Sequence, residues 1–173
     1  MMNRRANRGS ALLEMALLGV PMIFVWISIV EIGRGMWQFH VLQYATKQTG
    51  AYLAVHGSTC GIPPNSCTVK IRDAVAYFRT QGPVLSPDLV KLTFTSDSGA
   101  TVSCVPITSC ASNTTLWPPN SPATNPDNIP GKDLILRAQY SFRSAISMFA
   151  PGNAPVTFGT FYMVAGSQQS VLF

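Results

Sequence analysis

The chain is poor in charge and lacks the motifs on which most enzymes depend. Charged residues make up only 11% of its 173 residues, whereas hydrophobic residues make up 47%. The sequence has no Gly-x-Ser-x-Gly elbow, phosphate-binding glycine loop or His-Glu-x-x-His motif that would pair a nucleophile or a metal with a base. It also has no basic cluster with interleaved aromatic residues. We therefore expect no catalysis, no cofactor and no binding to nucleic acid.

Metal ligands are sparse as well. The two histidines, His40 and His56, each stand alone, without a cysteine, aspartate or second histidine at ligand spacing. The gaps between neighbouring cysteines are wider than those of usual zinc sites. We expect no metal site.

A long hydrophobic run is the main feature that is present. From Ala11 to Val30 the only ionisable side chain is Glu14. Such a run is about 30 Å long as a helix, which is the thickness of the hydrocarbon core of a bilayer. It therefore predicts a transmembrane helix over about 11–30. A carboxylate inside such a helix is costly, so Glu14 is a candidate functional residue.

A basic leader precedes this run. Three arginines come before Gly9, and this charge places the N-terminus in the cytoplasm and the rest of the chain outside. Cleavage between Gly9 and Ser10 would turn Ser10 into a free amine about one helical turn from Glu14. Cleavage would also leave nine Lys and Arg residues against seven Asp and Glu residues, so the formal charge of +5 says little about partners.

Two further features mark the predicted helix. Pro21 lacks a backbone N–H and clashes with the carbonyl of Leu17, so we expect a kink or a loosened turn there. Glu31 and Arg34 follow the run at i,i+3 spacing, which predicts an ion pair at the outer membrane edge. Apolar residues at spacings of three and four then continue the helix to about His56, with the face Ile32, Met36, Phe39, Leu42, Ala45, Tyr52 and Val55.

These N-terminal residues resemble a type IV prepilin. The basic leader ending in Gly9, the small residue Ser10 and Glu14 at the fifth mature position carry the resemblance. The continuation through Pro21 and the segment from Val30 to Arg34 is similar to TadE-like proteins of tight-adherence (Tad) pilus systems. Met15 differs from the Glu-Tyr pattern of major Flp-type pilins, so the resemblance indicates a pseudopilin or minor pilin.

The resemblance implies a non-enzymatic role in the biogenesis or assembly of a Tad (Flp-type) pilus used in adherence. Its implied partners are a prepilin peptidase, other Tad pilins or pseudopilins, the inner-membrane assembly platform and the lipid bilayer. The implied location is the bacterial inner membrane, with a single span and a periplasmic C-terminal domain, or an extracellular pilus after assembly. Two alternatives stay open: an unprocessed single-span envelope protein with a periplasmic binding domain, and a pseudopilin of a type II secretion system.

The remaining residues predict a small α+β head. We divide the chain into a leader (1–9), a long helix (10–56) and a periplasmic head (57–173). Alternation and turn signals in the head predict a sheet of about four antiparallel strands and one short helix, with the following ranges: a helix at 68–80, a hairpin of 89–96 with 101–105, an exposed loop at 108–132, and strands at 133–142 and 156–165.

The four cysteines fall into two close pairs in this head. Cys60 with Cys67, and Cys104 with Cys110, could each form a local disulfide, because the periplasm favours oxidation. Free thiols, or a cross-link such as Cys60 with Cys104, remain the alternatives.

Overall fold

The computed structural model describes residues 7–56, 69–119, 127–144 and 160–172. It contains one long helix, one short helix and two antiparallel sheets, which confirms the predicted α+β class. The chain divides into two compact units, residues 1–37 and residues 38–173, and each is described by itself. Helix α1 (Asn7–Ala54) contributes residues to both units.

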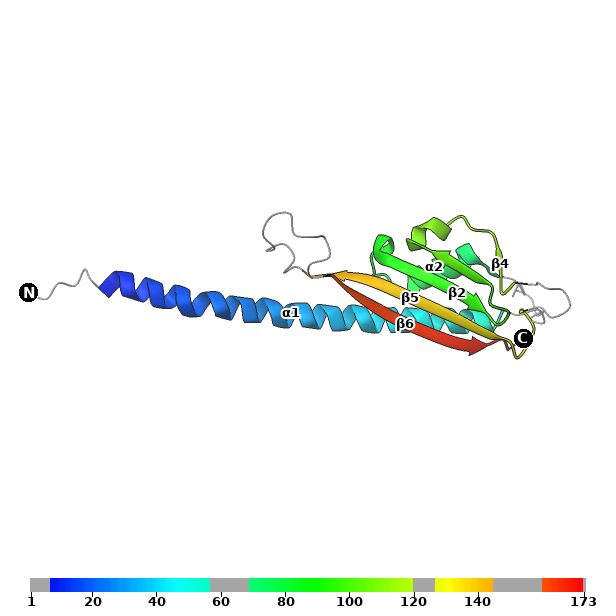
Figure 1. Cartoon of the computed structure of the whole chain (residues 1–173), viewed down its shortest axis with the longest axis horizontal. Coiled ribbons are helices and arrows are strands. Elements are labelled where there is room, and N and C mark those ends of the chain that lie inside the picture. Colours follow the sequence, from blue (N-terminus) through cyan, green and yellow to red (C-terminus); the bar gives the residue numbers. More distant parts are fainter. Residues whose placement is uncertain (1–6, 57–68, 120–126, 145–159, 173) are drawn as a thin grey trace, which may run out of the picture. The chain divides into compact units, whose positions relative to one another are not determined.

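All the described strands lie in the second unit. Its main sheet has four antiparallel strands in the order β3-β2-β5-β6 (Figure 1). These strands are β2 (Val90–Ser96), β3 (Thr101–Cys104), β5 (Asp133–Arg143) and β6 (Thr160–Ser170). A second sheet pairs β1 (Val69–Lys70) with β4 (Leu116–Trp117). The other elements are helix α2 (Ile71–Gln81) and the 3₁₀ turns η1 (Pro87–Leu89) and η2 (Ile107–Cys110).

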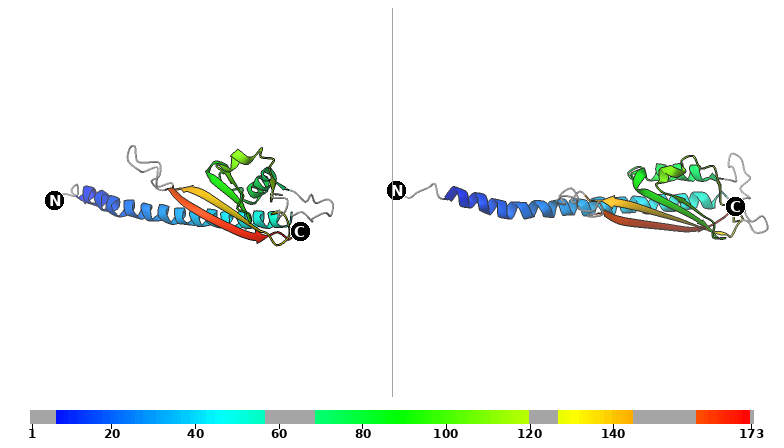
Figure 2. Two further views of the ribbon diagram at one scale, coloured as in Figure 1. Left: turned by 45° about the vertical axis from the view of Figure 1, so that its right-hand side comes forward. Right: turned by 45° about the horizontal axis from the view of Figure 1, so that its top comes forward.

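One face of the main sheet forms the core. Along β5 the residues from Leu134 to Phe142 alternate between buried and more exposed, as a strand with one covered face should. The buried residues join a single cluster with side chains of α2 and of residues 38–54 of α1. The views in Figure 2 agree with Figure 1 in placing β5 and β6 side by side, with this part of α1 along the sheet. On the opposite face, the described residues are exposed or half-buried, as Lys91 and Arg137 show.

The face that α1 buries in this core differs in part from the predicted one. Four residues of the predicted apolar face are exposed, namely Ile32, Met36, Phe39 and Val55. Two buried positions are instead the polar residues Thr46 and Thr49. Thr46 Oγ1 donates to the carbonyl of Leu42 at 2.7 Å, so this hydroxyl is satisfied inside the helix. The buried stripe is Leu42, Ala45, Thr46, Thr49, Gly50, Leu53 and Ala54. Small residues dominate it, which allows the helix to lie close to the sheet.

Three predicted ranges need correction. Helix α2 begins at Ile71 because residues 69–70 form β1 instead. The last strand continues to Ser170, five residues beyond its predicted end, because its polar C-terminal residues still pair with β5. The predicted exposed loop at 108–132 contains η2, β4 and the buried Trp117, whose ring packs against Phe94 at 5.9 Å between centroids. The predicted hairpin and the strand at 133–142 are confirmed.

One of the two predicted cysteine pairs is present. Cys104 and Cys110 form a disulfide between the end of β3 and the end of η2, and both residues are buried. This link holds the chain that follows β3 against the core. Cys60 and Cys67 lie outside the described residues.

A buried carboxylate fixes the hairpin turn. Asp127 is 1% exposed, and its side chain accepts hydrogen bonds from the backbone N–H of Ser98 at 3.1 Å and from the Ser98 hydroxyl. Burial alone would raise the pKa of Asp127, but the hydrogen bonds from Ser96 and Ser98 together outweigh burial and lower it. Nearby, Lys132 Nζ lies 2.8 Å from Asp97 Oδ2, so this cation also favours the charged carboxylate.

We expect Asp127→Ala to lower the free energy of unfolding by roughly 2–4 kcal/mol, because it removes the hydrogen bonds that Ser98 donates to a buried, charged carboxylate. A carboxyl group with a lowered folded-state pKa stabilises the fold above its unfolded-state pKa. That stability disappears as the pH falls through the folded-state value. Denaturant unfolding of the full chain in detergent should therefore show a steeper loss of stability below about pH 4 for the wild type than for Asp127→Ala.

The matched control for this experiment is Asp88→Ala, which removes an exposed carboxylate from η1. We expect it to change stability little. Equal effects of the two substitutions would show that Asp127 has no special role in the turn.

Candidate functional site

The N-terminal half of α1 exposes a continuous apolar surface within its own unit. Leu12, Leu13, Met15 and Leu17 are each at least 70% exposed. Removing these four side chains from water is worth on the order of 10 kcal/mol, which is comparable to the whole stability of a domain. Helix Ala11–Ala54 is long and apolar enough to cross a membrane. This surface is suited to contact with lipid or with other apolar helices.

The predicted processing site lies at the start of this helix. Gly9 and Ser10 fall in the first turn of α1, and Glu14 follows Ser10 at i,i+4 spacing on the same helix. Residues four apart lie on one face, about 6 Å apart along the axis. If the chain is cleaved before Ser10, the new amine would therefore lie one helical turn from Glu14. This separation is short enough for an ion pair between the amine and the carboxylate.

Pro21 lies inside α1, and the helix is assigned without a break on both sides of it. Its ring nitrogen cannot donate to the carbonyl of Leu17, so one helical hydrogen bond is missing at this point. In a membrane such a carbonyl needs another donor. Pro21 is therefore a position at which contact with a neighbouring helix or loss of helicity would cost less than elsewhere.

Charges reappear where the apolar run ends. Arg34 Nη2 lies 3.0 Å from Glu31 Oε2, the ion pair that the spacing indicates. With the Arg34 side chain 44% exposed, such a pair is worth no more than about 1 kcal/mol. Trp37 follows and is 63% exposed. Trp37 is not among the residues predicted from the sequence, although a tryptophan just beyond a charged helix segment is typical of a membrane interface.

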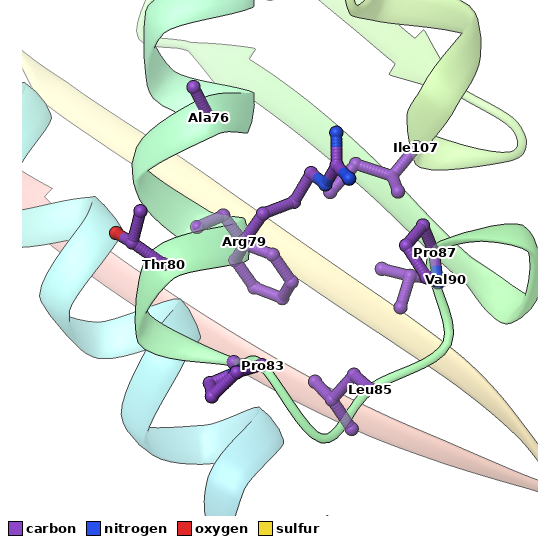
Figure 3. Close-up of a pocket in the computed structure, with 10 residues that line it drawn as sticks. Ala76, Arg79, Thr80, Pro83, Leu85, Pro87, Val90 and Ile107 are labelled. Carbon is purple, nitrogen blue, oxygen red and sulfur yellow. The ribbon is translucent and has the colours of Figure 1, made fainter.

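The head offers a pocket but no reactive pair within it. A cavity of about 420 Å³ lies between α2, the turn after it and η2 (Figure 3). Among its lining residues only Arg79 is ionisable, and its side chain extends across the pocket toward Ile107. An arginine stays protonated, so it cannot serve as a general base. The pocket can hold an apolar group near a cation, but its lining provides no proton-transfer chemistry.

The two histidines lie on α1 or directly after it, and His56 contacts its helical neighbour Tyr52. His56 Nδ1 lies 2.6 Å from the carbonyl of Tyr52, to which it donates, and its ring packs on Tyr52 at 4.4 Å between centroids. Tyr52 in turn stacks on Tyr77 of α2. His40 is exposed on α1. In the part of the chain that the structure describes, no three His, Cys, Asp or Glu residues come together as a metal site.

Comparison with known proteins locates the resemblance in this helix. A family model of TadE-like proteins matches residues 9–50, which include Ser10, Glu14, Pro21 and the Glu31–Arg34 pair. Searches of curated proteins and of solved structures find no match. The match ends within α1, before all the elements of the head. Over residues 9–50 this chain is therefore similar to TadE-like proteins.

Proposed function

We propose that the chain is a pseudopilin or minor pilin of a Tad pilus, a structural rather than enzymatic component needed to build the fibre. In this account a prepilin peptidase removes residues 1–9 and leaves Ser10 as the new N-terminus. The protein then stays in the inner membrane or enters the filament through its apolar helix.

The observation that best supports this proposal is the position of Glu14. It lies within the TadE-matched segment, four residues after Ser10, on a helix whose surroundings are otherwise apolar. A simple membrane anchor needs no carboxylate at this depth, because insertion becomes more favourable without it. An assembly subunit can use the carboxylate to neutralise the terminal amine of a neighbouring copy.

The proposed orientation is a cytoplasmic N-terminus and a periplasmic head. The three leader arginines support it, because positive residues stay on the cytoplasmic side. The buried Cys104–Cys110 disulfide supports it as well, because disulfides persist in the periplasm. The expected partners are the other Tad pilins and the assembly platform in the inner membrane.

Co-purification and piliation test this assignment together. A strain without the chain should lose its Tad pili and regain them on complementation, and the tagged full-length chain should co-purify with Tad platform proteins. Normal piliation in its absence, or co-purification with a type II secretion system instead, would show that the assignment is wrong.

A further inference from the structure

The two edge strands of the main sheet contain no charged residue. Strand β3 reads Thr-Val-Ser-Cys, and β6 reads Thr-Phe-Tyr-Met-Val-Ala-Gly-Ser-Gln-Gln-Ser. The charged residues of the sheet lie on the central strands, at Lys91 in β2 and at Asp133, Arg137 and Arg143 in β5. Proteins usually place lysine or proline on exposed edges to prevent pairing with other chains. Here the arrangement is reversed, so neither edge is protected in this way.

The hydrogen-bond register shows which backbone groups face the open side of β6. Ser96 N donates to the carbonyl of Ala100, so the even-numbered residues of β2 face β3 and the odd-numbered ones face β5. The odd-numbered residues of β5 therefore bond to β2, and its even-numbered residues bond to β6. These even-numbered residues pair with the odd-numbered residues of β6, so the backbone groups of the even-numbered residues of β6 point outward. The residues after β6 continue this alternation. The backbone N–H of Val171 donates to the carbonyl of Lys132, the residue that precedes β5, whereas the N–H of Leu172 points the other way and donates to the carbonyl of Ala54.

Within the part of the chain that the structure describes, the outward groups have few partners. Gln43 Nε2 approaches the carbonyl of Val164 at 3.5 Å, at the limit of a hydrogen bond. Among the described residues, no backbone hydrogen bond is found to the outward groups of Tyr162, Gly166 or Gln168. In β3 the even-numbered residues bond to β2, so the backbone groups of Thr101 and Ser103 point outward. Each edge thus presents a row of donors and acceptors.

Exposed apolar side chains accompany both edges. Phe161, Tyr162 and Val164 are each more than half exposed, although successive residues of a strand point to opposite faces. Val105, directly after β3, is 58% exposed. An uncharged strand with apolar side chains on both faces is a template for pairing with another strand.

The direction of the strands indicates which strand fits. Each neighbouring pair in the sheet is antiparallel, so in a four-stranded sheet β3 and β6 run in opposite directions. A second copy displaced sideways in the same orientation would bring its β3 antiparallel to β6 of the first. Pairing of β6 with β6 would instead turn the two copies in opposite directions. Only the first arrangement lets every copy keep the same direction.

We propose that β6 of one copy pairs with β3 of a second copy of this chain, joining their heads into a continuous antiparallel sheet. The contact is head-to-tail, so each copy retains one free edge and the association can extend. This proposal concerns association of the purified chain with itself. It can therefore be wrong while the assignment to a Tad pilus is right, and it can be right while that assignment is wrong.

Lysine substitutions on the solvent face of the sheet test the contact in the full-length protein in detergent micelles. Val164→Lys blocks β6 and Ser103→Lys blocks β3. Gln139→Lys places the same charge directly opposite Val164, but on the central strand β5, and is the matched control. By analytical ultracentrifugation we expect the wild type and Gln139→Lys to associate with rising concentration. We expect each edge variant alone to associate at least about tenfold more weakly, a loss of about 1.4 kcal/mol.

A mixture of the two edge variants gives the decisive result. The free β3 of Val164→Lys can pair with the free β6 of Ser103→Lys, so the mixture should form one-to-one dimers that grow no further. Hydrogen exchange should then slow at the even-numbered amides of β6. Three outcomes would overturn the proposal. The mixture could remain monomeric, neither lysine could weaken association, or only Val164→Lys could weaken it. Slow exchange of the even-numbered amides in monomeric Val164→Lys would also overturn it, since the chain's own residues would then cover the edge.

Discussion

Replacing Glu14 by glutamine is expected to abolish incorporation of the protein into pili while leaving membrane insertion and leader cleavage intact. Glutamine keeps the length and polarity of the side chain but cannot pair ionically with an amine. Insertion should not suffer, because an uncharged amide is less costly than a carboxylate in hydrocarbon. Assembly should suffer, because the terminal amine of Ser10 would lose its counter-charge.

The physical reason lies in the low dielectric of the membrane. A carboxylate there either takes up a proton or approaches a cation. After cleavage the amine of Ser10 would begin the helix and have the helix's free N–H groups around it, so a neighbouring copy shifted along a filament would bring its Glu14 to this positive end. The pair would fix the position of each subunit relative to the next.

Piliation, membrane fractionation and the mass of the N-terminus should be measured on the same cells. Glu31→Gln is the matched control, because it neutralises a carboxylate of the same helix at the Glu31–Arg34 pair. We expect the control to assemble normally. Normal piliation in Glu14→Gln would show that Glu14 is not the contact that sets subunit position.

The second large effect is expected at Gly50. A Cβ atom at this position would lie 2.6 Å from Ser167 Oγ and 3.1 Å from Ser167 Cβ, so α1 and β6 meet here without room for a side chain. Gly50→Val should therefore force the helix away from the sheet and destabilise the head by about 3 kcal/mol. Chemical unfolding of the full chain in detergent measures this difference.

Two variants separate a steric cause from a general effect of removing glycine. Gly33→Ala changes a glycine of the same helix that has open space around it, and should be neutral or slightly stabilising. Gly50→Ala adds only the Cβ atom that meets Ser167 and should also destabilise the head. Ser167→Gly removes the obstructing side chain and should recover much of this lost stability when it is combined with Gly50→Ala. Independent, additive effects of the two substitutions would contradict the proposed contact.

The sequence predicted best those elements that strong local patterns encode. The apolar run, the alternation in β5 and the turn at Asp97–Gly99 each specify one type of structure, and the structure contains the corresponding helix, strand and hairpin. The disulfide between Cys104 and Cys110 followed from short spacing and the expected compartment. The spacing of Ser10 and Glu14 could likewise be read from the sequence alone, although its role remains a prediction.

The elements that were missed depend on contacts between distant residues. Thr46, Thr49 and Gly50 do not look like core residues in isolation, yet they are buried because β6 and α2 need a close approach to α1. The pairing of β1 with β4 joins residues nearly fifty positions apart through two short strands. The burial of Asp127 depends equally on the distant Ser98. Periodicity within a short window contains no information about such partners.

The most direct test of the account is the N-terminal residue of the protein recovered from bacterial membranes. Mass spectrometry should find a chain that begins at Ser10, and Gly9→Leu should cause the longer precursor to accumulate. This result would establish the protein as a processed pilin-like subunit with its new amine one turn from Glu14. Recovery of the assembled protein with residues 1–9 still attached would contradict the account and favour an unprocessed membrane anchor.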